Sequence, residues 1–302
     1  MSKKDRVTLR PLELYEVAIS VTQLEDISAF YRDVWGLLEV SGGSGWCRLA
    51  GTHQSAGGTV LISRESHGLH HLAFRAVDTA HLHDLVDAMT AAGQTPIDDV
   101  ATRGVEQGVA FKDPDGNRIE IVVTDLTDQI LASPLIDRVR PRRLGHVVLG
   151  TPNILKMEHF YQHLGFVITD RTAPGMSFMR SNSDHHSLAF VPSSASWLQH
   201  VAYDVGDVDN VMKGVAALVD CGMRPLWGPG RHGPGRNVFA YFQDPMGTII
   251  EYYGDLEQFA VVDADIEPKI WGPEHRGDTW GLAGAPPPAF FTPPNPLRTP
   301  TT

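Results

Sequence analysis

The sequence predicts an α+β fold made of two copies of one domain. Three observations predict it: an ordered set of motifs that recurs about 130 residues further on, strand patterns that alternate with amphipathic helices, and a proline-rich tail outside both copies. Hydrophobic residues make up 42% of the 302 residues and charged residues 20%, which is typical of a chain that folds around a core.

The repeat consists of three pairs of segments in the same order. Glu16-Val-Ala-Ile-Ser recurs from His146, His71-Leu-Ala-Phe recurs from His200, and Phe111-Lys-Asp-Pro-Asp-Gly recurs from Phe242, at offsets of 130, 129 and 131 residues. Chance similarity would keep neither the order nor the spacing, so we expect a duplicated domain. The predicted units are 1–135, 136–262 and a C-terminal extension over 263–302.

Each copy is predicted to contain two β-α-β-β-β units and to close with a hairpin. The hairpin turns, Asp113-Pro-Asp-Gly and Asp244-Pro-Met-Gly, have Pro and Gly where a type I turn prefers them. Residues 126–143 are interpreted as a connector, the tail after about 262 as neither helix nor sheet, and the residues from about 292 as disordered. Strands are expected at 14–21, 58–63, 71–77, 145–150, 186–191 and 200–205, and helices at 79–92, 208–221 and around Phe30-Tyr31 and Phe160-Tyr161.

Charge and composition exclude several classes of function. The 25 basic and 36 acidic residues give a net charge of −11, which argues against a nucleic acid or an anionic membrane as partner. No apolar stretch reaches the roughly 20 residues of a membrane span, and no secretory signal is recognised, so we expect a cytoplasmic protein. Two cysteines, Cys47 and Cys221, suit a reducing compartment and are too few for an all-cysteine zinc site.

Histidine and carboxylate are the candidate ligands of any metal, because the chain has fourteen histidines. The second copy places His146 on its first strand, His200 on a middle strand and Glu251 on its last strand. Two imidazoles and one carboxylate from different strands can bind non-heme Fe(II) and leave open positions opposite. Each residue alone is compatible with a satisfied core position, but three such groups in apolar strands would be costly without a ligand. The sequence therefore predicts a metal site.

The architecture and these residues resemble the vicinal oxygen chelate superfamily, which groups glyoxalases, bleomycin resistance proteins and dioxygenases. Within it, the chain is similar to the two-domain type I extradiol dioxygenases, over about residues 13–262. The similar segments are Asp184-His-His-Ser-Leu-Ala-Phe, Gly228-Pro-Gly-Arg-His-Gly, Phe239-Ala-Tyr-Phe and Ile249-Ile-Glu-Tyr. The stretch 271–280 resembles the C-terminal extension of the homoprotocatechuate branch.

The resemblance implies a fold, a cofactor and a reaction. Each domain is expected to form an open, curved mixed sheet around a metal site, and the chain is expected to assemble as a homo-oligomer. His146, His200 and Glu251 are expected to bind Fe(II), with Mn(II) as the alternative. The expected substrates are a catechol-type diol and O2, and the expected product is a ring-opened muconic semialdehyde-type acid.

The resemblance also assigns roles to three further residues of the second copy. His186 matches the acid–base histidine of the family, and a histidine can take and return a proton near neutrality. Tyr241 and His232 match a tyrosine and a histidine that contact the substrate. Without the resemblance, the sequence favours a surface histidine at position 186. Tyr241 would also suit a core aromatic position, and its spacing of ten residues to Glu251 favours a role in the site. His185 is expected to face the other side of the strand, because successive side chains alternate.

The first copy retains only part of this set. Glu16, His71 and Glu120 align with the three predicted ligands, so a second metal is left open. Gly58 stands where the acid–base histidine falls, and Ala110 stands where the tyrosine falls. We therefore expect the first copy to be catalytically inactive and to pack its sheet against the second copy.

Two departures from the homoprotocatechuate branch concern the substrate pocket. Trp227 stands where one carboxylate-binding arginine would fall, and Val148 replaces a polar residue two positions after the first metal histidine. These departures favour an uncharged catechol. Two other functions stay open: another metalloenzyme of this superfamily, such as a glyoxalase-like isomerase or a ring hydrolase, and a metal-free small-molecule binding protein.

Overall fold

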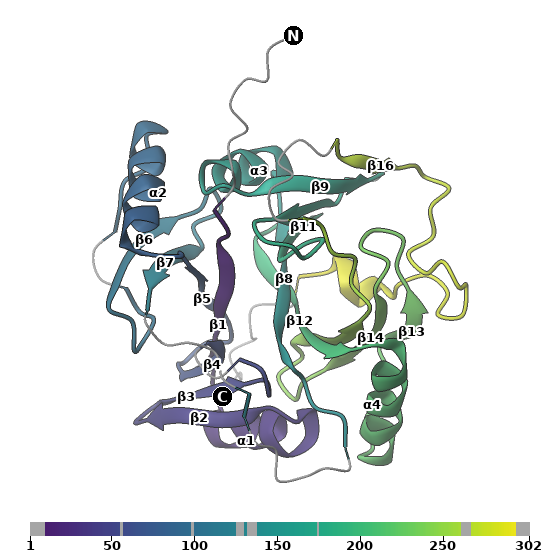
Figure 1. Ribbon diagram of the computed structural model, residues 1–302. Coiled ribbons are helices and arrows are strands. Elements are labelled where there is room, and N and C mark those ends of the chain that lie inside the picture. Colours follow the sequence, from purple (N-terminus) through teal and green to yellow (C-terminus); the bar gives the residue numbers. More distant parts are fainter. Residues whose placement is uncertain are drawn as a thin grey trace, which may run out of the picture.

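Two mixed β-sheets stand side by side in the computed structural model, one for each copy of the repeat (Figure 1). The structure describes residues 10–54, 57–97, 100–124, 130–131, 138–173, 175–260 and 267–293. In each sheet the first strand of the copy lies in the interior, between the last strand of the first unit and the first strand of the second unit. The predicted α+β class and the duplication are confirmed.

The first sheet has the strand order β2-β3-β4-β1-β5-β7-β6. Its second unit has one strand fewer than expected among the described residues, where a single bridge joins Ile97 and Ala110. The strands are β1 (Glu13–Val21), β2 (Leu38–Gly43), β3 (Trp46–Ala50), β4 (Gly58–Ser63), β5 (Gly68–Arg75), β6 (Gln107–Lys112) and β7 (Arg118–Val123), and the helices are α1 (Leu24–Ala29), the π-helical turn η1 (Phe30–Trp35) and α2 (Thr79–Ala91).

The second sheet has the order β13-β14-β15-β12-β8-β11-β10-β9-β16. Its three central strands, β15, β12 and β8, carry the predicted metal ligands. The elements are β8 (Arg143–Thr151), α3 (Ile154–His163), β9 (Val167–Thr172), β10 (Ser177–Arg180), β11 (Leu188–Pro192), β12 (Trp197–Gly206), α4 (Val208–Asp220), β13 (Trp227–Arg231), β14 (Val238–Gln243), β15 (Ile249–Gly254), β16 (Lys269–Trp271) and the 3-10 helix η2 (Pro288–Phe291).

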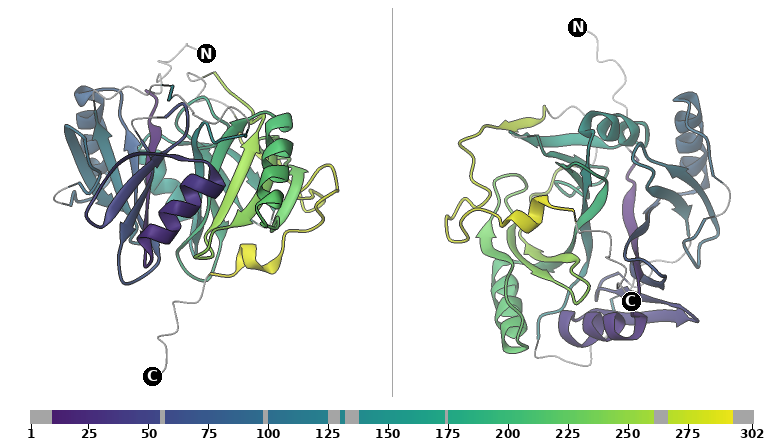
Figure 2. Two further views of the ribbon diagram at one scale, coloured as in Figure 1. Left: turned by 90° about the horizontal axis from the view of Figure 1, so that it is seen from below. Right: turned by 180° about the vertical axis from the view of Figure 1, so that it is seen from behind.

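Several sequence predictions need correction. The strand expected at 186–191 begins at Leu188, so His186 lies in the loop before β11. The Phe30-Tyr31 pair lies in η1 rather than in an α-helix. The tail is not free of regular structure, because β16 pairs with β9 and η2 lies against the second sheet (Figure 2). Most of the connector and the end of the tail lie outside the described residues.

Short polar side chains fix where the elements near the site begin. Asp207 accepts a hydrogen bond from the backbone N–H of Asn210 and caps α4. In the β14–β15 turn, the Asp244 carboxylate accepts from the backbone N–H of Met246 (2.9 Å) and Thr248 (2.8 Å). These bonds set the register in which Tyr241 faces Glu251 across the hairpin.

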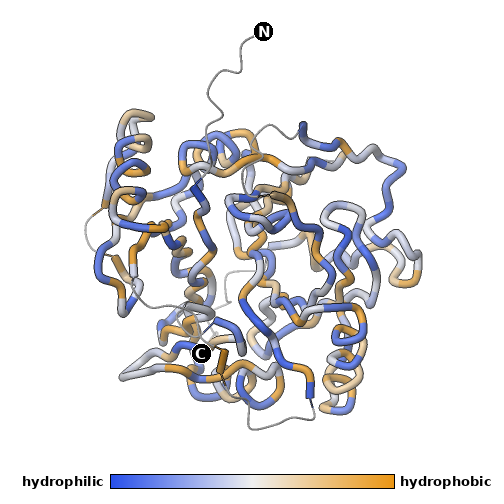
Figure 3. The backbone as a smooth tube through the Cα atoms, viewed as in Figure 1, coloured by the Kyte–Doolittle hydropathy of each residue, from blue (hydrophilic) through white to orange (hydrophobic). Residues whose placement is uncertain are grey.

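The two copies share one hydrophobic core. Trp35 of η1 is fully buried and packs edge-on against Tyr203 and Phe242 and in a tilted stack on Tyr252, all three in the second sheet. Hydrophobic and hydrophilic positions both occur along the strands and the helices of the two copies (Figure 3). This contact confirms that the first copy packs against the second.

Two tyrosine–aspartate hydrogen bonds also join the copies. In one the tyrosine belongs to the first copy, and in the other it belongs to the second. The Tyr31 hydroxyl of the first copy donates to Asp244 Oδ2 of the second copy (3.1 Å), and the Tyr161 hydroxyl of the second donates to Asp113 Oδ2 of the first (3.4 Å). Both aspartates belong to the Asp-Pro-x-Gly turns, so each turn is tied to the other copy. No helix among the described residues is long and apolar enough to cross a membrane.

Candidate metal centre

Three neighbouring strands bring the predicted ligands together. His146 on β8 and Glu251 on β15 both lie opposite Ala202 of the strand between them, β12. Residues directly opposite on paired strands share a face of the sheet, so the three side chains point the same way. His200 lies two residues before Ala202 on β12, so its side chain points to the same face.

The ligand atoms form a nearly equilateral triangle. Nε2 of His146 lies 3.1 Å and Nε2 of His200 lies 3.2 Å from Oε2 of Glu251, and the two Nε2 atoms are 3.3 Å apart. Ligands about 2.1 Å from a metal, at right angles to one another, would be about 3.0 Å apart. The three residues thus fit one face of a metal ion. In the part of the chain that the structure describes, no other group of three His, Cys, Asp or Glu residues has its ligand atoms this close.

Neighbouring amides orient two of the ligands. Nδ1 of His200 is hydrogen-bonded to the Gln199 side-chain oxygen, so Nδ1 carries the proton and Nε2 offers its lone pair. The side-chain amide of Asn237 donates to Oε1 of Glu251 (3.2 Å), which leaves Oε2 for the metal. Gln199 and Asn237 were not predicted from the sequence, because a polar residue beside a candidate ligand has no motif of its own.

The protonation states favour metal binding. Burial alone would raise the pKa of Glu251, but the charges and hydrogen bonds of His146 and His200 outweigh it and lower that pKa to about 2. Burial lowers the pKa of His200, against the attraction of Glu251. At neutral pH the carboxylate is therefore ionised and His200 is neutral, which are the forms that donate electron pairs to a metal.

His186 lies beside the triad, on the side of β11. Its ring centroid is 4.3 Å from that of His146 and 5.1 Å from that of Phe178. The Nδ1 atoms of His185 and His186 are 3.0 Å apart, so His185 does not face the other side as predicted. The prediction was wrong because these residues precede β11, where side chains need not alternate. Burial lowers the pKa of His186 well below its ordinary value.

Tyr241 and His232 lie together on the other side of the triad. The ring of Tyr241 is 5.2 Å from that of His200, and its hydroxyl oxygen is 2.9 Å from Nε2 of His232. Nδ1 of His232 lies 2.8 Å from the Gly277 carbonyl oxygen, so Nδ1 donates there and Nε2 accepts from Tyr241. Burial lowers the pKa of His232 to about 4, which keeps this ring neutral.

Apolar side chains flank the triad. Val148 packs with Phe178, Ala189 and Val191 near His186. Trp227 stacks on Tyr241, with ring centroids 5.5 Å apart, and Phe290 of the C-terminal extension contacts Tyr241 edge-on at 4.7 Å. The contribution of Phe290 was not predicted, because its proline-rich surroundings indicate no packed element.

Both candidate glutamates of the first copy accept hydrogen bonds from groups of the protein. Glu120 accepts hydrogen bonds from the backbone N–H of Ala101 and Thr102, from the Thr102 hydroxyl and from Nε of Arg118. Glu16 contacts Nη2 of Arg48 at 2.8 Å. These donors occupy both carboxylate oxygens of Glu120 and Oε2 of Glu16.

The strand registers relate the two copies residue by residue. Ala110 faces Glu120 as Tyr241 faces Glu251, so Ala110 is the counterpart of the tyrosine, as predicted. The counterpart of His186 differs from the prediction by one residue. Gly58 lies opposite Glu16, which corresponds to His146, and Leu188 lies opposite Val147, the residue after His146. Gly58 therefore corresponds to the residue just before Leu188, and not to His186. Gly57 rather than Gly58 therefore stands in the place of the acid–base histidine, and a glycine still occupies it.

The sequence matches the Glyoxalase/Bleomycin resistance protein/Dioxygenase superfamily over residues 14–121 and 143–252. It is 35% identical over 217 residues to Metapyrocatechase 2 of Cupriavidus necator. The matched region covers 62% of this chain and 67% of that protein. It is 31% identical over 194 residues to a 3-methylcatechol 2,3-dioxygenase of Pseudomonas putida, which covers 57% of this chain and 65% of that protein. The chain belongs to this superfamily.

Two solved structures share the fold. The Mn(II)-bound glyoxalase from Novosphingobium aromaticivorans has a TM-score of 0.84 and 30% identity, over 97% of each chain. The homoprotocatechuate 2,3-dioxygenase from Arthrobacter globiformis has a TM-score of 0.82 and 21% identity, over 96% of each chain. The second likeness concerns the fold alone.

Removing the carboxylate should abolish metal binding. We expect Glu251→Gln to lose divalent metal, because the amide no longer supplies the negative charge, and Asn237→Ala to lower metal affinity about 10- to 100-fold. Metal content after dialysis and titration with Mn(II) measure both effects. The control is Glu106→Gln, at an exposed carboxylate of the first copy. Full metal content in folded Glu251→Gln protein would contradict the assignment.

Proposed function

We propose that this protein cleaves the ring of a catechol-type diol with O2, in the extradiol position, at a 2-His-1-carboxylate Fe(II) centre. One observation carries the proposal: the triangle of His146, His200 and Glu251 lies between His186 on one side and the Tyr241–His232 pair on the other. Ring cleavage of a metal-bound diol needs groups on both sides of the metal that take up, hold and return the protons of the two hydroxyl groups, and these residues can supply them.

A metal held by His146, His200 and Glu251 would supply Lewis acidity and, as iron, redox capacity. Iron is our choice because two histidines and one carboxylate on one face, with open positions opposite, are the ligand set of non-heme Fe(II) oxygenases. Mn(II) is the alternative. It is the ion bound in the Novosphingobium glyoxalase.

Tyr241 is suited to hold one substrate oxygen. Its hydroxyl donates to Nε2 of His232, whose Nδ1–H is fixed on the Gly277 carbonyl. With its proton directed at His232, the Tyr241 oxygen can accept a hydrogen bond from a catechol hydroxyl. Burial raises the pKa of Tyr241 well above its ordinary value, so the phenol keeps its proton.

His186 is suited to take the other proton. Burial keeps its imidazole neutral, and its ring lies against the ligand His146, within reach of a diol held at the triad. It can accept a proton as the catechol binds and return it to an oxygen of the opening ring. One C–C bond of the ring is broken, both atoms of O2 enter the product, and no external reductant is consumed.

The surroundings favour an uncharged ring. Val148, Phe178 and Phe290 place apolar groups on both sides of the triad, and Trp227 fills the position expected for an arginine. A substrate carboxylate would lose its hydration there without a basic partner. We therefore propose an alkyl- or aryl-substituted catechol.

We assign residues 1–135 to a catalytically inactive domain, 136–262 to the catalytic domain and 263–302 to an extension. The glycine in the place of His186, the alanine in the place of Tyr241 and the hydrogen-bonded Glu120 support the inactive assignment. A homo-oligomer in the cytoplasm remains part of the proposal.

A glyoxalase-type isomerase is the second candidate, because a structure of that description matches almost the whole chain at 30% identity. The Tyr241–His232 pair and His186 argue against it. A metal-free binding protein has no use for three ligand atoms on one triangle.

Ring cleavage can be measured directly. The protein is loaded anaerobically with Fe(II), mixed with 3-methylcatechol or 2,3-dihydroxybiphenyl, and exposed to O2. We expect O2 uptake and a yellow ring-fission product, whereas methylglyoxal with glutathione, the matched isomerase substrate pair, should show no turnover. Turnover of the latter pair and no O2 uptake with a broad catechol panel would establish the second candidate instead.

His186 should affect turnover and not metal content. We expect His186→Ala to slow kcat by about 100-fold or more, because the proton no longer has an acceptor, while Fe(II) stays bound. The control is His163→Ala, at the end of α3 and away from the triad. Loss of metal in His186→Ala would show that His186 is a ligand, and unchanged kcat would remove it from the mechanism.

A further inference from the structure

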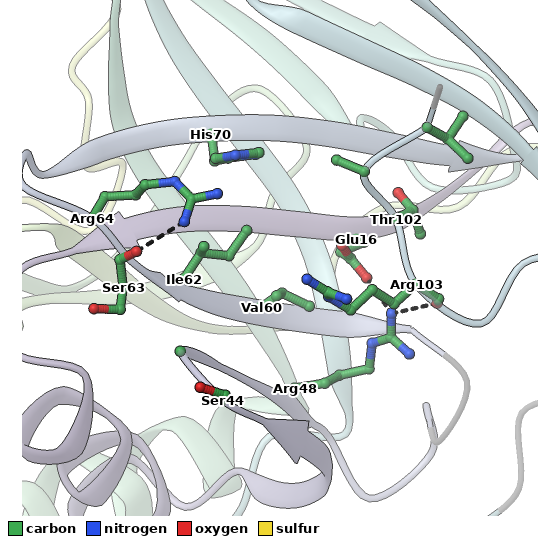
Figure 4. A pocket seen from close by; sticks show the side chains of 13 residues that line it. Glu16, Ser44, Arg48, Val60, Ile62, Ser63, Arg64, His70, Thr102 and Arg103 are labelled. Atoms are coloured by element: carbon green, nitrogen blue, oxygen red, sulfur yellow. Dashed lines mark hydrogen bonds and ion pairs between the residues drawn. The ribbon is translucent and has the colours of Figure 1, made fainter. Parts of the chain in front are cut away.

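A cavity of about 360 Å³ opens on the first sheet, where the described residues do not bring three His, Cys, Asp or Glu ligand atoms together as the second sheet does. Its lining includes Glu16, Arg48, Val60, Ile62, Arg64 and Arg103, which come from three strands and the loops beside them (Figure 4). Its volume lies in the range of about 300–1,000 Å³ typical of small-molecule sites. We propose that this cavity binds a small organic carboxylate with an apolar body. The proposal does not depend on the reaction of the second copy.

Arg48 is a buried cation in the first copy, near the positions that correspond to the predicted metal site of the second copy. It lies opposite Val60, as Phe178 lies opposite Ala189 in the second sheet, so an arginine stands where the catalytic copy has an apolar ring. Its Nη2 donates to Glu16 at 2.8 Å and to the Arg103 carbonyl oxygen at 2.8 Å. Its Nε is buried and has no acceptor among the described residues.

The charge of the cavity is opposite to that of the whole protein. Arg48, Arg64 and Arg103 line it with only one carboxylate, Glu16, although the chain carries a net charge of −11. Arg48 neutralises Glu16, which leaves two guanidinium groups in excess. Both Arg64 and Arg103 are exposed at the cavity and can move onto a ligand. Guanidinium groups bind carboxylates through paired, charge-assisted hydrogen bonds.

One wall of the cavity is apolar. Val60 and Ile62 of β4 belong to a small hydrophobic cluster with Ala18 of β1, against which Trp46 packs. The guanidinium of Arg103 lies 4.7 Å from the centre of the Trp46 ring, so that basic and apolar surfaces meet. An inorganic anion would leave this wall unused, whereas an organic carboxylate uses both surfaces.

Benzoate is the probe. We expect isothermal titration of the metal-loaded protein to show benzoate binding that weakens at least about fivefold in Arg64→Gln/Arg103→Gln, because two charge-assisted contacts are lost. Both substituted residues are exposed, so the variant should fold, unlike one at the buried Arg48. The control is Arg224→Gln, at an exposed arginine of the second copy, which should bind like the parent protein. Benzamide, which has the same shape without the charge, should bind at least about fivefold more weakly.

The results that would overturn the proposal follow directly from this design. They are no benzoate binding at millimolar concentration, equal binding by the double variant, and equal binding of benzamide. Phosphate that binds more tightly than benzoate would contradict the organic ligand. Loss of benzoate binding in Glu251→Gln with no loss in the double variant would place the ligand at the catalytic copy instead.

Discussion

The structure depends on the adjacency of β8, β12 and β15 at the centre of the second sheet. This order places His146 and Glu251 in one row, on either side of Ala202, and puts His200 one step away on the same face. Two imidazoles and a carboxylate would be expensive to bury without a partner. The triangle of about 3 Å edges, the proton fixed on His200 by Gln199 and the low pKa of Glu251 are consistent with a bound cation as that partner.

The two copies show that one fold can hold different cationic groups: a predicted metal site in the second copy and an arginine side chain in the first. The tyrosine–aspartate bonds between the Asp-Pro-x-Gly turns hold the copies in equivalent positions. Within this shared frame, the second copy has three free ligand atoms and an apolar ring at Phe178. The first copy has Arg48 at the corresponding position and saturates Glu120 with local donors. A few substitutions thus separate a metal site from an arginine-lined cavity.

The sequence predicted the repeat, the interior strands and the three residues that the structure brings together, because these follow from short motifs with fixed spacing. It could not predict contacts that depend on chain packing across long separations. Asn237 and Gln199 beside the ligands, and Phe290 against Tyr241, are of this kind. The orientation predicted for His185 was wrong. Side chains alternate between the two faces only within a strand, and β11 begins after His185, later than its apolar pattern indicates.

The central claim is that the His146–His200–Glu251 centre inserts O2 into a catechol ring. Single-turnover reaction of the Fe(II)-loaded protein with an alkylcatechol under oxygen-18 gas tests it most directly. We expect one ring-opened product per iron, with both labelled atoms retained when the product is quenched before exchange with water. A product that carries one labelled atom, or an unopened ring oxidised to a quinone, would contradict the account.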